Sequence, residues 1–102
     1  MRIVIADGSS AADYVIKAFR KIGNELIVIN SRKDIVQYLV KSNQIPVIYG
    51  EPYKTSILRE AHIEGADLFI ALGKEDTDNF VSCMLAKKVF HVKKCICTVN
   101  DP

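Results

Sequence analysis

The residues whose types and spacing best suit chemistry lie at one junction near the N-terminus. The apolar run Ile3–Ala6 leads directly into the small polar turn Asp7-Gly8-Ser9-Ser10, and Ala11 then opens an amphipathic stretch. A short strand, a tight turn and a helix N-terminus together form an anion cradle, because the first N–H groups of a helix have no partner within it. The hydroxyls of Ser9 and Ser10 add donors. The junction therefore predicts a phosphate-binding site, and the alternative is a plain turn with a helix cap.

A second polar cluster follows the next apolar run. Asn30 stands where dinucleotide-binding sites place an acid that holds ribose hydroxyls. An amide both donates and accepts, so Asn30 can bind a ribose in a weaker form. Ser31, Arg32 and Lys33 come next, and the basic pair favours a phosphorylated ribose or a longer phosphate chain. The alternative is that Ser31 caps a helix and the two cations are solvated.

No set of residues has the spacing of a catalytic or metal centre. The sequence holds neither a Ser–His–Asp arrangement nor two histidines spaced for one helix face. Cys95 and Cys97 would share one face of a strand, and with Cys83 they make an odd number, which favours small buried thiols over a disulfide framework, a metal site or a redox pair. His62 and His91 are expected at the surface. The sequence therefore predicts a binding protein rather than an enzyme.

The elements that must position these residues alternate between strand and helix. Leu26–Ile29 is continuously apolar, which is typical of a strand covered on both faces in a parallel sheet. The expected strands are Arg2–Ala6, Glu25–Asn30, Ile45–Tyr49, Asp67–Leu72 and Lys94–Val99. The expected helices are Ser10–Ile22, one beginning after Ser31, Lys54–Ala61 and Glu75–Phe90. The apolar positions expected to face the core are Ala11, Val15, Ala18, Phe19 and Ile22 in the first helix, Ile35, Val36, Leu39 and Val40 in the second, and Phe80, Cys83, Met84 and Val89 in the last.

This alternation defines the fold class. Right-handed crossovers build an α/β, Rossmann-like, doubly wound parallel sheet in three layers, with strand order 3-2-1-4-5. The topological switch point then lies between the first and fourth strands, beside the turn at Asp7. The 102 residues suit one domain, 1–102, and the end directly after the fifth strand suggests a truncated or partner-dependent piece.

Composition excludes several classes of function. A net charge of +2 with the cations spread along the chain is too weak to indicate a nucleic-acid partner. No apolar run approaches the roughly 20 residues that cross a bilayer, so direct membrane insertion is not expected. The N-terminus has a strand pattern rather than that of a signal peptide. A cytoplasmic location is the default expectation.

Four stretches together follow the pattern of one known family. They are Met1–Ile5 leading to the turn, Leu26–Asn30, Gly50-Glu51 with Ile57–Ala71, and Glu75–Asn79 continuing to Val99-Asn100-Asp101-Pro102. The third is the most specific, because Leu58–Ala71 matches L-x-x-A-x-I-x-x-A-D-x-x-I-A. Over essentially its whole length the sequence resembles the TrkA-N type of RCK domain, a cytosolic regulator of potassium conductance and uptake.

The resemblance implies particular ligand contacts. The family's G-x-G-x-x-G turn aligns with Asp7, Ser9 and Ala12, so the carboxylate of Asp7 would repel a phosphate and the Cβ of Ser9 would fill part of its space. Ala12 is the mildest of these changes. By the same resemblance, further residues flank the adenosine and phosphates: Gly50, Glu51, Ala71, Leu72, Gly73 and Asn79.

The resemblance also implies a function. We expect a regulatory subunit or domain that binds an adenine nucleotide and gates a potassium channel or uptake system through changes in assembly, peripheral to the membrane through its partner. The altered glycines favour AMP, ADP or ATP over NAD(H). Homo- or hetero-oligomers of RCK domains are expected. The alternatives are an RCK-like scaffold that binds no nucleotide and, from another class, a fragment of an NAD-dependent oxidoreductase.

Overall fold

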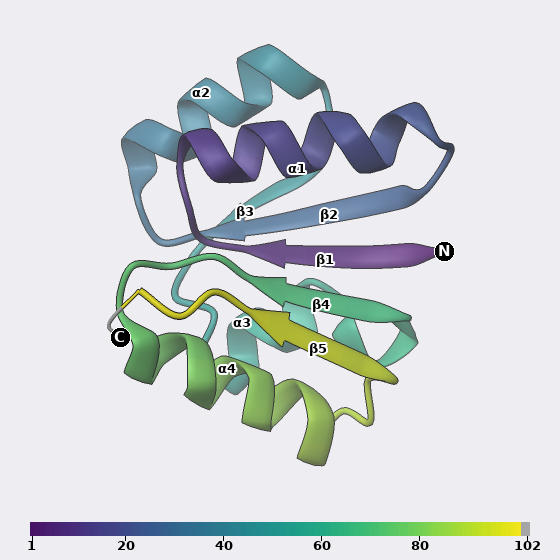
Figure 1. The fold of residues 1–102 in the computed structure, drawn as a ribbon, viewed down its shortest axis with the longest axis vertical. Coiled ribbons are helices and arrows are strands. Elements are labelled where there is room, and N and C mark those ends of the chain that lie inside the picture. Colours follow the sequence, from purple (N-terminus) through teal and green to yellow (C-terminus); the bar gives the residue numbers. More distant parts are fainter. Residues whose placement is uncertain (101–102) are drawn as a thin grey trace.

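One parallel five-stranded sheet forms the centre of the molecule, in the order β3-β2-β1-β4-β5 (Figure 1). The computed structural model describes residues 1–100; Asp101 and Pro102, which end the fourth family-like stretch, lie outside the described residues. The order confirms the expectation from right-handed crossovers. The strands are β1 (Arg2–Ala6), β2 (Glu25–Asn30), β3 (Val47–Tyr49), β4 (Leu68–Ala71) and β5 (Lys94–Cys97).

Helices cover the two faces of this sheet and complete the three layers (Figure 1). On one face lie α1 (Ser10–Lys21) and α2 (Lys33–Asn43), and on the other lie α3 (Thr55–Glu60) and α4 (Asp76–Lys88). A short 3-10 turn, η1 (Ile63–Gly65), joins α3 to β4. Each crossover leads from the carboxyl end of one strand back to the start of the next, so all the strands end at the same edge of the sheet.

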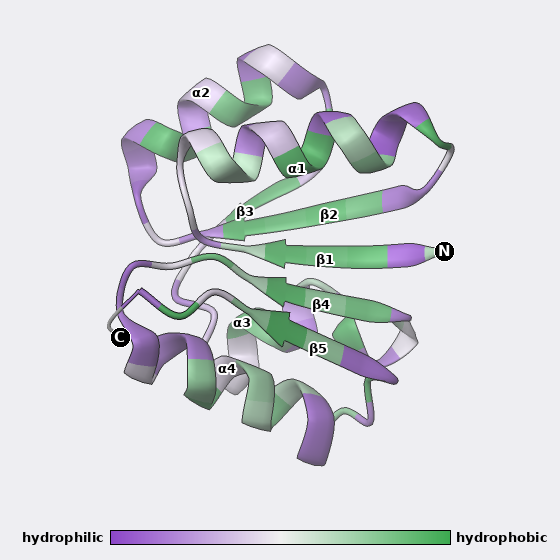
Figure 2. Cartoon of the chain, viewed as in Figure 1, coloured by the Kyte–Doolittle hydropathy of each residue, from purple (hydrophilic) through white to green (hydrophobic). Residues whose placement is uncertain are grey.

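Strand β1 shows why the apolar runs are continuous. Ile3 and Ile5 belong to the core under α1 and α2, whereas Val4 and Ala6 belong to the core under α3 and α4. All four side chains are fully buried. Alternate residues of a strand point to opposite faces, and both faces are covered here, so each position must be apolar. The green central strands of Figure 2 show the result.

The face expected for α1 is confirmed in part, because Val15 and Phe19 pack against the core. Ala12 and Ile16 are the fully buried residues of α1, whereas Ala11, Ala18 and Ile22 are exposed. One flank of α1 contacts α2 through polar groups instead. Asp13 accepts hydrogen bonds from Tyr38 and Asn43, and Arg20 donates to the carbonyl of Asn43. Part of the expected apolar stripe of α1 therefore faces outward.

In α4 the expectation is confirmed for Cys83, which packs against the core, but not for the larger apolar residues. Its buried residues are Asn79, Ser82 and Ala86, whereas Phe80 is 61% exposed and Met84 and Val89 are about half exposed. Small and polar residues let the helix approach the sheet closely. The large apolar residues of α4 therefore lie on its outer side.

Some boundaries also differ from the sequence expectation. Strand β3 begins at Val47 rather than Ile45, so Pro46 precedes it and accepts a hydrogen bond from the Val28 N–H at 3.0 Å. Pro46 has no N–H to donate, which places it naturally outside the ladder. Strand β4 ends at Ala71 rather than Leu72, and strand β5 ends at Cys97 rather than Val99.

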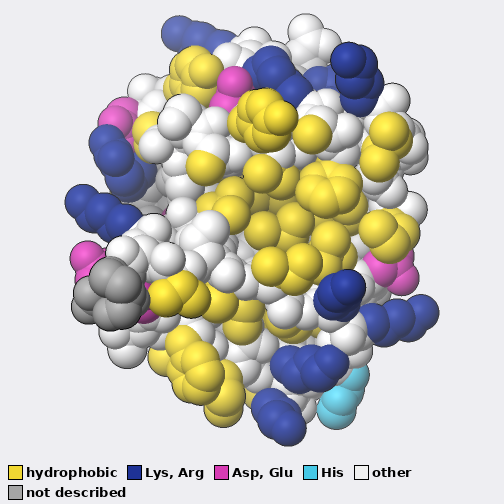
Figure 3. Space-filling view, viewed as in Figure 1, with side chains coloured by type: hydrophobic (Ala, Val, Ile, Leu, Met, Phe, Trp, Pro, Cys, Tyr) yellow, Lys and Arg dark blue, Asp and Glu magenta, His cyan; other side chains and the backbone are white. Residues whose placement is uncertain are grey.

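Part of the sheet is uncovered on the α1 side. Within residues 1–100 no helix lies over β4 and β5 on that face (Figure 1), and hydrophobic side chains gather there between α1 and β5 (Figure 3). Cys95 and Cys97 pack against the core on the α4 side, so Ile96 between them faces the opposite way, and it is 45% exposed. On this face Ile96 of β5 is therefore exposed, whereas Leu68 and Ile70 of β4 are buried in the core.

Candidate functional site

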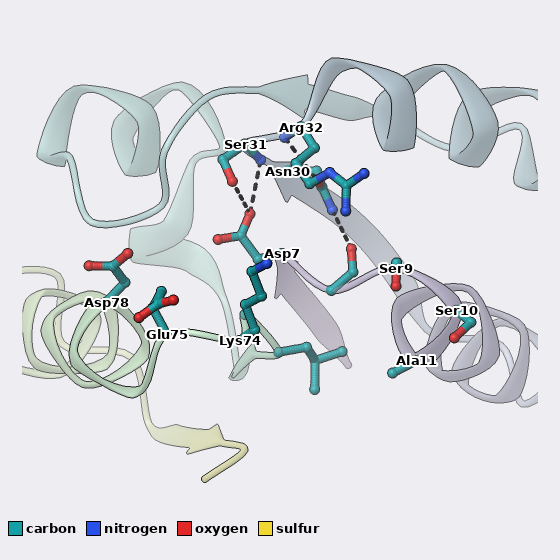
Figure 4. A pocket seen from close by; sticks show the side chains of 13 residues that line it. Asp7, Ser9, Ser10, Ala11, Asn30, Ser31, Arg32, Lys74, Glu75 and Asp78 are labelled. Atoms are coloured by element: carbon teal, nitrogen blue, oxygen red, sulfur yellow. Dashed lines mark hydrogen bonds between the residues drawn. The ribbon is translucent and has the colours of Figure 1, made fainter. Parts of the chain in front are cut away.

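A cavity of about 350 Å³ lies at the carboxyl edge of the sheet, beside the ends of β1 and β4. This is the topological switch point, where open α/β sheets bind their ligands. Most of the residues expected at the site line the cavity: Asp7, Gly8, Ser9, Ser10, Ala11, Asn30, Ser31, Arg32, Leu72 and Gly73. Figure 4 shows them around one opening, with α1 on one side and α4 on the other. The remaining four, Gly50, Glu51, Ala71 and Asn79, are not among the lining residues.

The turn after β1 has the left-handed backbone that this kind of site requires. Asp7 has φ +60° and Gly8 has φ +89°. Asp is one of the few residues with a side chain that enters this region at modest cost. A Cβ on Gly8 would stand 3.0 Å from the Leu72 Cβ and 3.3 Å from the Ala12 Cβ. Gly8 is therefore the glycine that lets the turn pass close to β4 and α1.

The N-terminus of α1 opens into the cavity. Ser9 is the N-cap residue, yet its side chain makes no capping hydrogen bond. The first backbone bond of the helix runs from the Asp13 N–H to the Ser9 carbonyl, at 3.1 Å. The preceding N–H groups of Ser10, Ala11 and Ala12 have no carbonyl within the helix to reach. The start of α1 therefore offers several backbone donors and the hydroxyl of Ser9 to an anion.

The carboxylate of Asp7 is turned toward the end of β2. Its Oδ1 accepts hydrogen bonds from the backbone N–H and the hydroxyl of Ser31, both at 2.9 Å (Figure 4). Burial is the main cause that raises the pKa of Asp7, and the charges of Asp78 and Glu51 add to it, while the bonds from Ser31 oppose it. The carboxylate thus ties the turn after β1 to the residue that follows β2.

The hydroxyl of Ser31 therefore does not cap α2, contrary to the sequence-based expectation. The N-cap residue of α2 is Arg32, and no side chain caps this helix. Arg32 lines the cavity, and its guanidinium pairs with Asp34 at 2.8 Å on the surface. The polar cluster after β2 is therefore organised by Asp7 rather than by the helix it precedes.

Asn30 is buried, with 1% of its surface exposed. Its Nδ2 donates to the Gly8 carbonyl at 2.9 Å, and its Oδ1 accepts from the Arg32 N–H at 3.1 Å. The side chain therefore fixes the backbone on both sides of the cavity.

Asn79 fixes the backbone that follows β4 at the edge of the cavity. It is 3% exposed, its Oδ1 accepts from the Gly73 N–H at 2.9 Å, and its Nδ2 donates to the carbonyls of Gly73 at 2.7 Å and Thr98 at 3.3 Å. A Cβ on Gly73 would stand 3.0 Å from the Asn79 Oδ1 and 3.3 Å from the Asp7 Oδ2. Gly73 thus leaves room for both side chains. Ala71, at the end of β4, is buried in the core.

Gly50 and Glu51 follow β3, to one side of the cavity. A Cβ on Gly50 would collide with the Ile57 side chain at 2.5 Å, so this glycine allows α3 to pack. Glu51 forms an ion pair with Lys54 at 2.9 Å and accepts a hydrogen bond from the Tyr53 hydroxyl, and both lower its pKa. Glu51 reaches the site through its charge, which helps raise the pKa of Asp7.

The cavity also holds residues that were not expected as contacts. Lys74, Glu75 and Asp78 line its far side, across from the start of α1 (Figure 4). Glu75 is the N-cap residue of α4 and Asp78 lies in its first turn, where acids complement the helix dipole. Their position just after a strand that ends at the switch point was the available signal. The site therefore carries three carboxylates and, in Arg32 and Lys74, two cations.

The cysteines and histidines lie away from this cavity. Cys83, Cys95 and Cys97 are free thiols packed against the core on the α4 side, as expected for small hydrophobes. Burial raises the pKa of Cys83 to about 12. His62 and His91 are exposed, as expected. Among residues 1–100, no three His, Cys, Asp or Glu side chains are arranged to hold a metal ion.

Comparison with known sequences gives one family and a set of relatives. The family described as the TrkA-N domain matches residues 3–102. The chain is 33% identical over 103 residues to a Trk system potassium uptake protein TrkA homolog of Archaeoglobus fulgidus, and 22% identical over 101 residues to Trk system potassium uptake protein TrkA of Haemophilus influenzae. It covers 100% and 99% of its own length in these alignments, but 23% and 22% of the relatives. The chain thus spans less than a quarter of these two proteins.

Solved structures give the same fold. A structure titled "GsuK channel bound to NAD" superposes with a TM-score of 0.83 at 20% identity, covering 99% of this chain and 18% of that one. The crystal structure of the GsuK RCK domain superposes with a TM-score of 0.81 at 20% identity, covering 99% and 22%. At this identity the likeness establishes the architecture of the chain.

Proposed function

The chain belongs to the TrkA-N domain family, and from this premise we propose that it is a regulatory domain of a potassium channel or uptake system that binds an adenine nucleotide at the β1–β4 cavity. The observation that carries the proposal is the open start of α1 facing that cavity, with Ser9 uncapped and Gly8 close to Leu72. Backbone donors and a positive helix end suit a phosphate. The family supplies the potassium transport system as the context.

The proposed action is binding rather than catalysis. A ligand that prefers one of two assembly states shifts the balance between them by its difference in affinity. Such a shift in paired domains would move an attached membrane subunit. The proposed partners are a potassium channel or transporter subunit and other RCK-type domains, with which this domain forms homo- or hetero-oligomers. Apolar residues exposed on α4 and on β5, such as Phe80 and Ile96, support an assembled state.

The proposed location is cytoplasmic, beside a membrane partner. Across the described part of the chain, no helix combines the length and the apolar character that a bilayer crossing demands. Attachment through a partner is therefore proposed. Among nucleotides, we favour AMP, ADP or ATP over NAD(H), because Asp7 and Ser9 stand where the family has glycines. The NAD named for the GsuK structure makes NAD(H) the main competitor.

Calorimetric titration with AMP, ADP, ATP, NAD and NADH tests the proposal, together with thermal melts at millimolar ligand. A ligand at about 100 times its Kd stabilises the folded state by about 2.7 kcal/mol. A matched pair of variants locates the site. Ala11→Glu places a carboxylate at the start of α1, whereas Ala18→Glu makes the same change at an exposed position further along the same helix. Acids near a helix N-terminus are tolerated, and Ala18 is exposed, so both variants should fold.

We expect Ala11→Glu to abolish binding and Ala18→Glu to retain it. Tight NAD(H) binding without any response to the mononucleotides would reverse the ligand preference. Absence of binding by every nucleotide would leave the chain as an RCK-like scaffold. Nucleotide-dependent change in the masses seen by native mass spectrometry would support regulation through assembly.

A further inference from the structure

The ribose-binding acid of the nucleotide fold has no counterpart on β2 of this chain. Dinucleotide-binding sites place that carboxylate at the end of β2. Asn30 holds this position, but it is 1% exposed, and its amide is bonded to the Gly8 carbonyl and the Arg32 N–H. It carries no charge and its groups are engaged with the backbone. A nucleotide in this cavity must therefore find its ribose acceptor elsewhere.

Asp7 supplies a carboxylate at that same place from the neighbouring strand. Both hydrogen bonds from Ser31 converge on its Oδ1, and Ser31 is the first residue after β2. Among residues 1–100, no protein donor bonds to its Oδ2, which lies on the Gly73 side of the cavity. One oxygen is thus anchored and the other is left to accept. Figure 4 shows the carboxylate beside Ser31 and away from the start of α1.

The charges around the cavity limit the number of phosphates. The start of α1 with Ser9, Ser10 and Ala11 offers donors on one side, whereas Glu75 and Asp78 line the opposite side (Figure 4). Asp7 lies between them. Arg32 already pairs with Asp34, which leaves Lys74 as the other cation at the cavity. A first phosphate meets backbone donors, and a second or third phosphate extends toward carboxylates.

We propose that Asp7 is the ribose-binding acid of this site and that the cavity selects a nucleoside monophosphate over nucleoside triphosphates and dinucleotides. The proposal rests on the proposed function, because it presumes that an adenine nucleotide occupies the cavity. The Asp7 Oδ2 accepts a hydrogen bond from a ribose hydroxyl, and the start of α1 holds the single phosphate. A carboxylate acceptor makes a stronger hydrogen bond than a neutral one.

Calorimetric affinities for AMP, 2′-deoxy-AMP, 3′-deoxy-AMP, ATP and NAD test this assignment on three proteins. These are the natural chain, Asp7→Asn and a control, Glu64→Gln. Asn retains an acceptor for Ser31 and tolerates the left-handed backbone, so Asp7→Asn should fold. Glu64→Gln removes one negative charge at an exposed residue of η1, outside the set of lining residues. Circular dichroism confirms that each protein is folded.

In the natural chain and the control, we expect AMP to bind about tenfold or more tightly than at least one deoxy analogue, and more tightly than ATP or NAD. In Asp7→Asn the preference over the deoxy analogue should fall severalfold, and ATP should gain relative to AMP. Equal binding of the deoxy analogues, or an unchanged order in Asp7→Asn, would overturn the assignment and leave nucleotide binding intact. Failure of all ligands on the natural chain would instead refute the proposed function, and this inference with it.

Discussion

Asn79 gives the sharpest test of how the cavity wall is built. Its side chain makes three hydrogen bonds to backbone groups while being 3% exposed, two to Gly73 and one to the Thr98 carbonyl. Each such bond contributes about 1 kcal/mol net, and the Thr98 bond at 3.3 Å is the weakest. Asn79→Ala removes all three and leaves backbone groups of the half-buried Gly73 and the exposed Thr98 without this partner. We expect a loss of about 2–3 kcal/mol in the free energy of unfolding.

Urea unfolding followed by circular dichroism measures this loss. For a domain of this size, about 2–3 kcal/mol corresponds to a fall in Tm of roughly 10–20 °C. Thr77→Ala, at an exposed residue two positions earlier on α4, is the matched control and should change stability by less than about 0.5 kcal/mol. A loss below about 1 kcal/mol in Asn79→Ala would refute the reasoning, because it would mean that water or Asn100, which also donates to the Gly73 carbonyl, satisfies the freed groups.

Three further predictions follow from buried groups. Asn30→Ala should cost about 1–2 kcal/mol in urea unfolding, because it frees the Gly8 carbonyl and the Arg32 N–H. Burial raises the pKa of Asp7, and the charges of Asp78 on α4 and Glu51 after β3 add to this shift, so the charged form of Asp7 destabilises the folded state at neutral pH. Asp7→Asn should therefore be more stable than the natural chain at neutral pH. This difference in stability should shrink as the pH falls and Asp7 becomes protonated. Cys83, with its pKa raised to about 12, should react with iodoacetamide at pH 8 on the order of 100-fold more slowly in the folded chain than in urea, as followed by mass spectrometry.

The strand order and the position of the cavity could be predicted because they depend on patterns within each segment. A continuously apolar Leu26–Ile29 indicates burial on both faces, and strands separated by helices indicate right-handed crossovers. These two rules fix the switch point beside Asp7. The cavity lies there. No contact between distant side chains was needed to reach this result.

The rotation of the helices could not be predicted in the same way. Moving one residue along a helix turns the side chain by about 100°, so choosing Ala11 or Ala12 as the buried residue changes the whole face. Helix α1 has apolar residues over much of its circumference, and its polar flank meets α2 through the contact of Asp13 with Asn43, 30 residues away. In α4 the large apolar Phe80 lies outside while Asn79 is buried. Composition alone gives the opposite choice.

The hydrogen-bond partners of side chains across the cavity could not be predicted from the sequence either. Ser31 looked like a helix cap because it precedes α2, but its hydroxyl meets Asp7 from 24 residues earlier in the chain. The turn residue and the residue after β2 become neighbours only when β1 and β2 pair in register, with Ala6 opposite Ile29. The hydroxyl of Ser31 then donates to the partly buried carboxylate of Asp7 instead of capping α2.

In the altered glycine motif, neighbouring residues therefore take over the structural roles of the glycines. The left-handed turn is kept by Asp7 at φ +60°, the close approach to β4 is provided by Gly8, and tight packing of α1 is kept by the fully buried Ala12. An aspartate in the left-handed region is less favourable than a glycine there, and two hydrogen bonds from Ser31 offset that cost. The backbone of the cradle is thus retained although all three glycines of the family motif are replaced. The chemical change that remains is one added carboxylate, and through its charge we propose that this cavity takes other ligands than an intact glycine motif does.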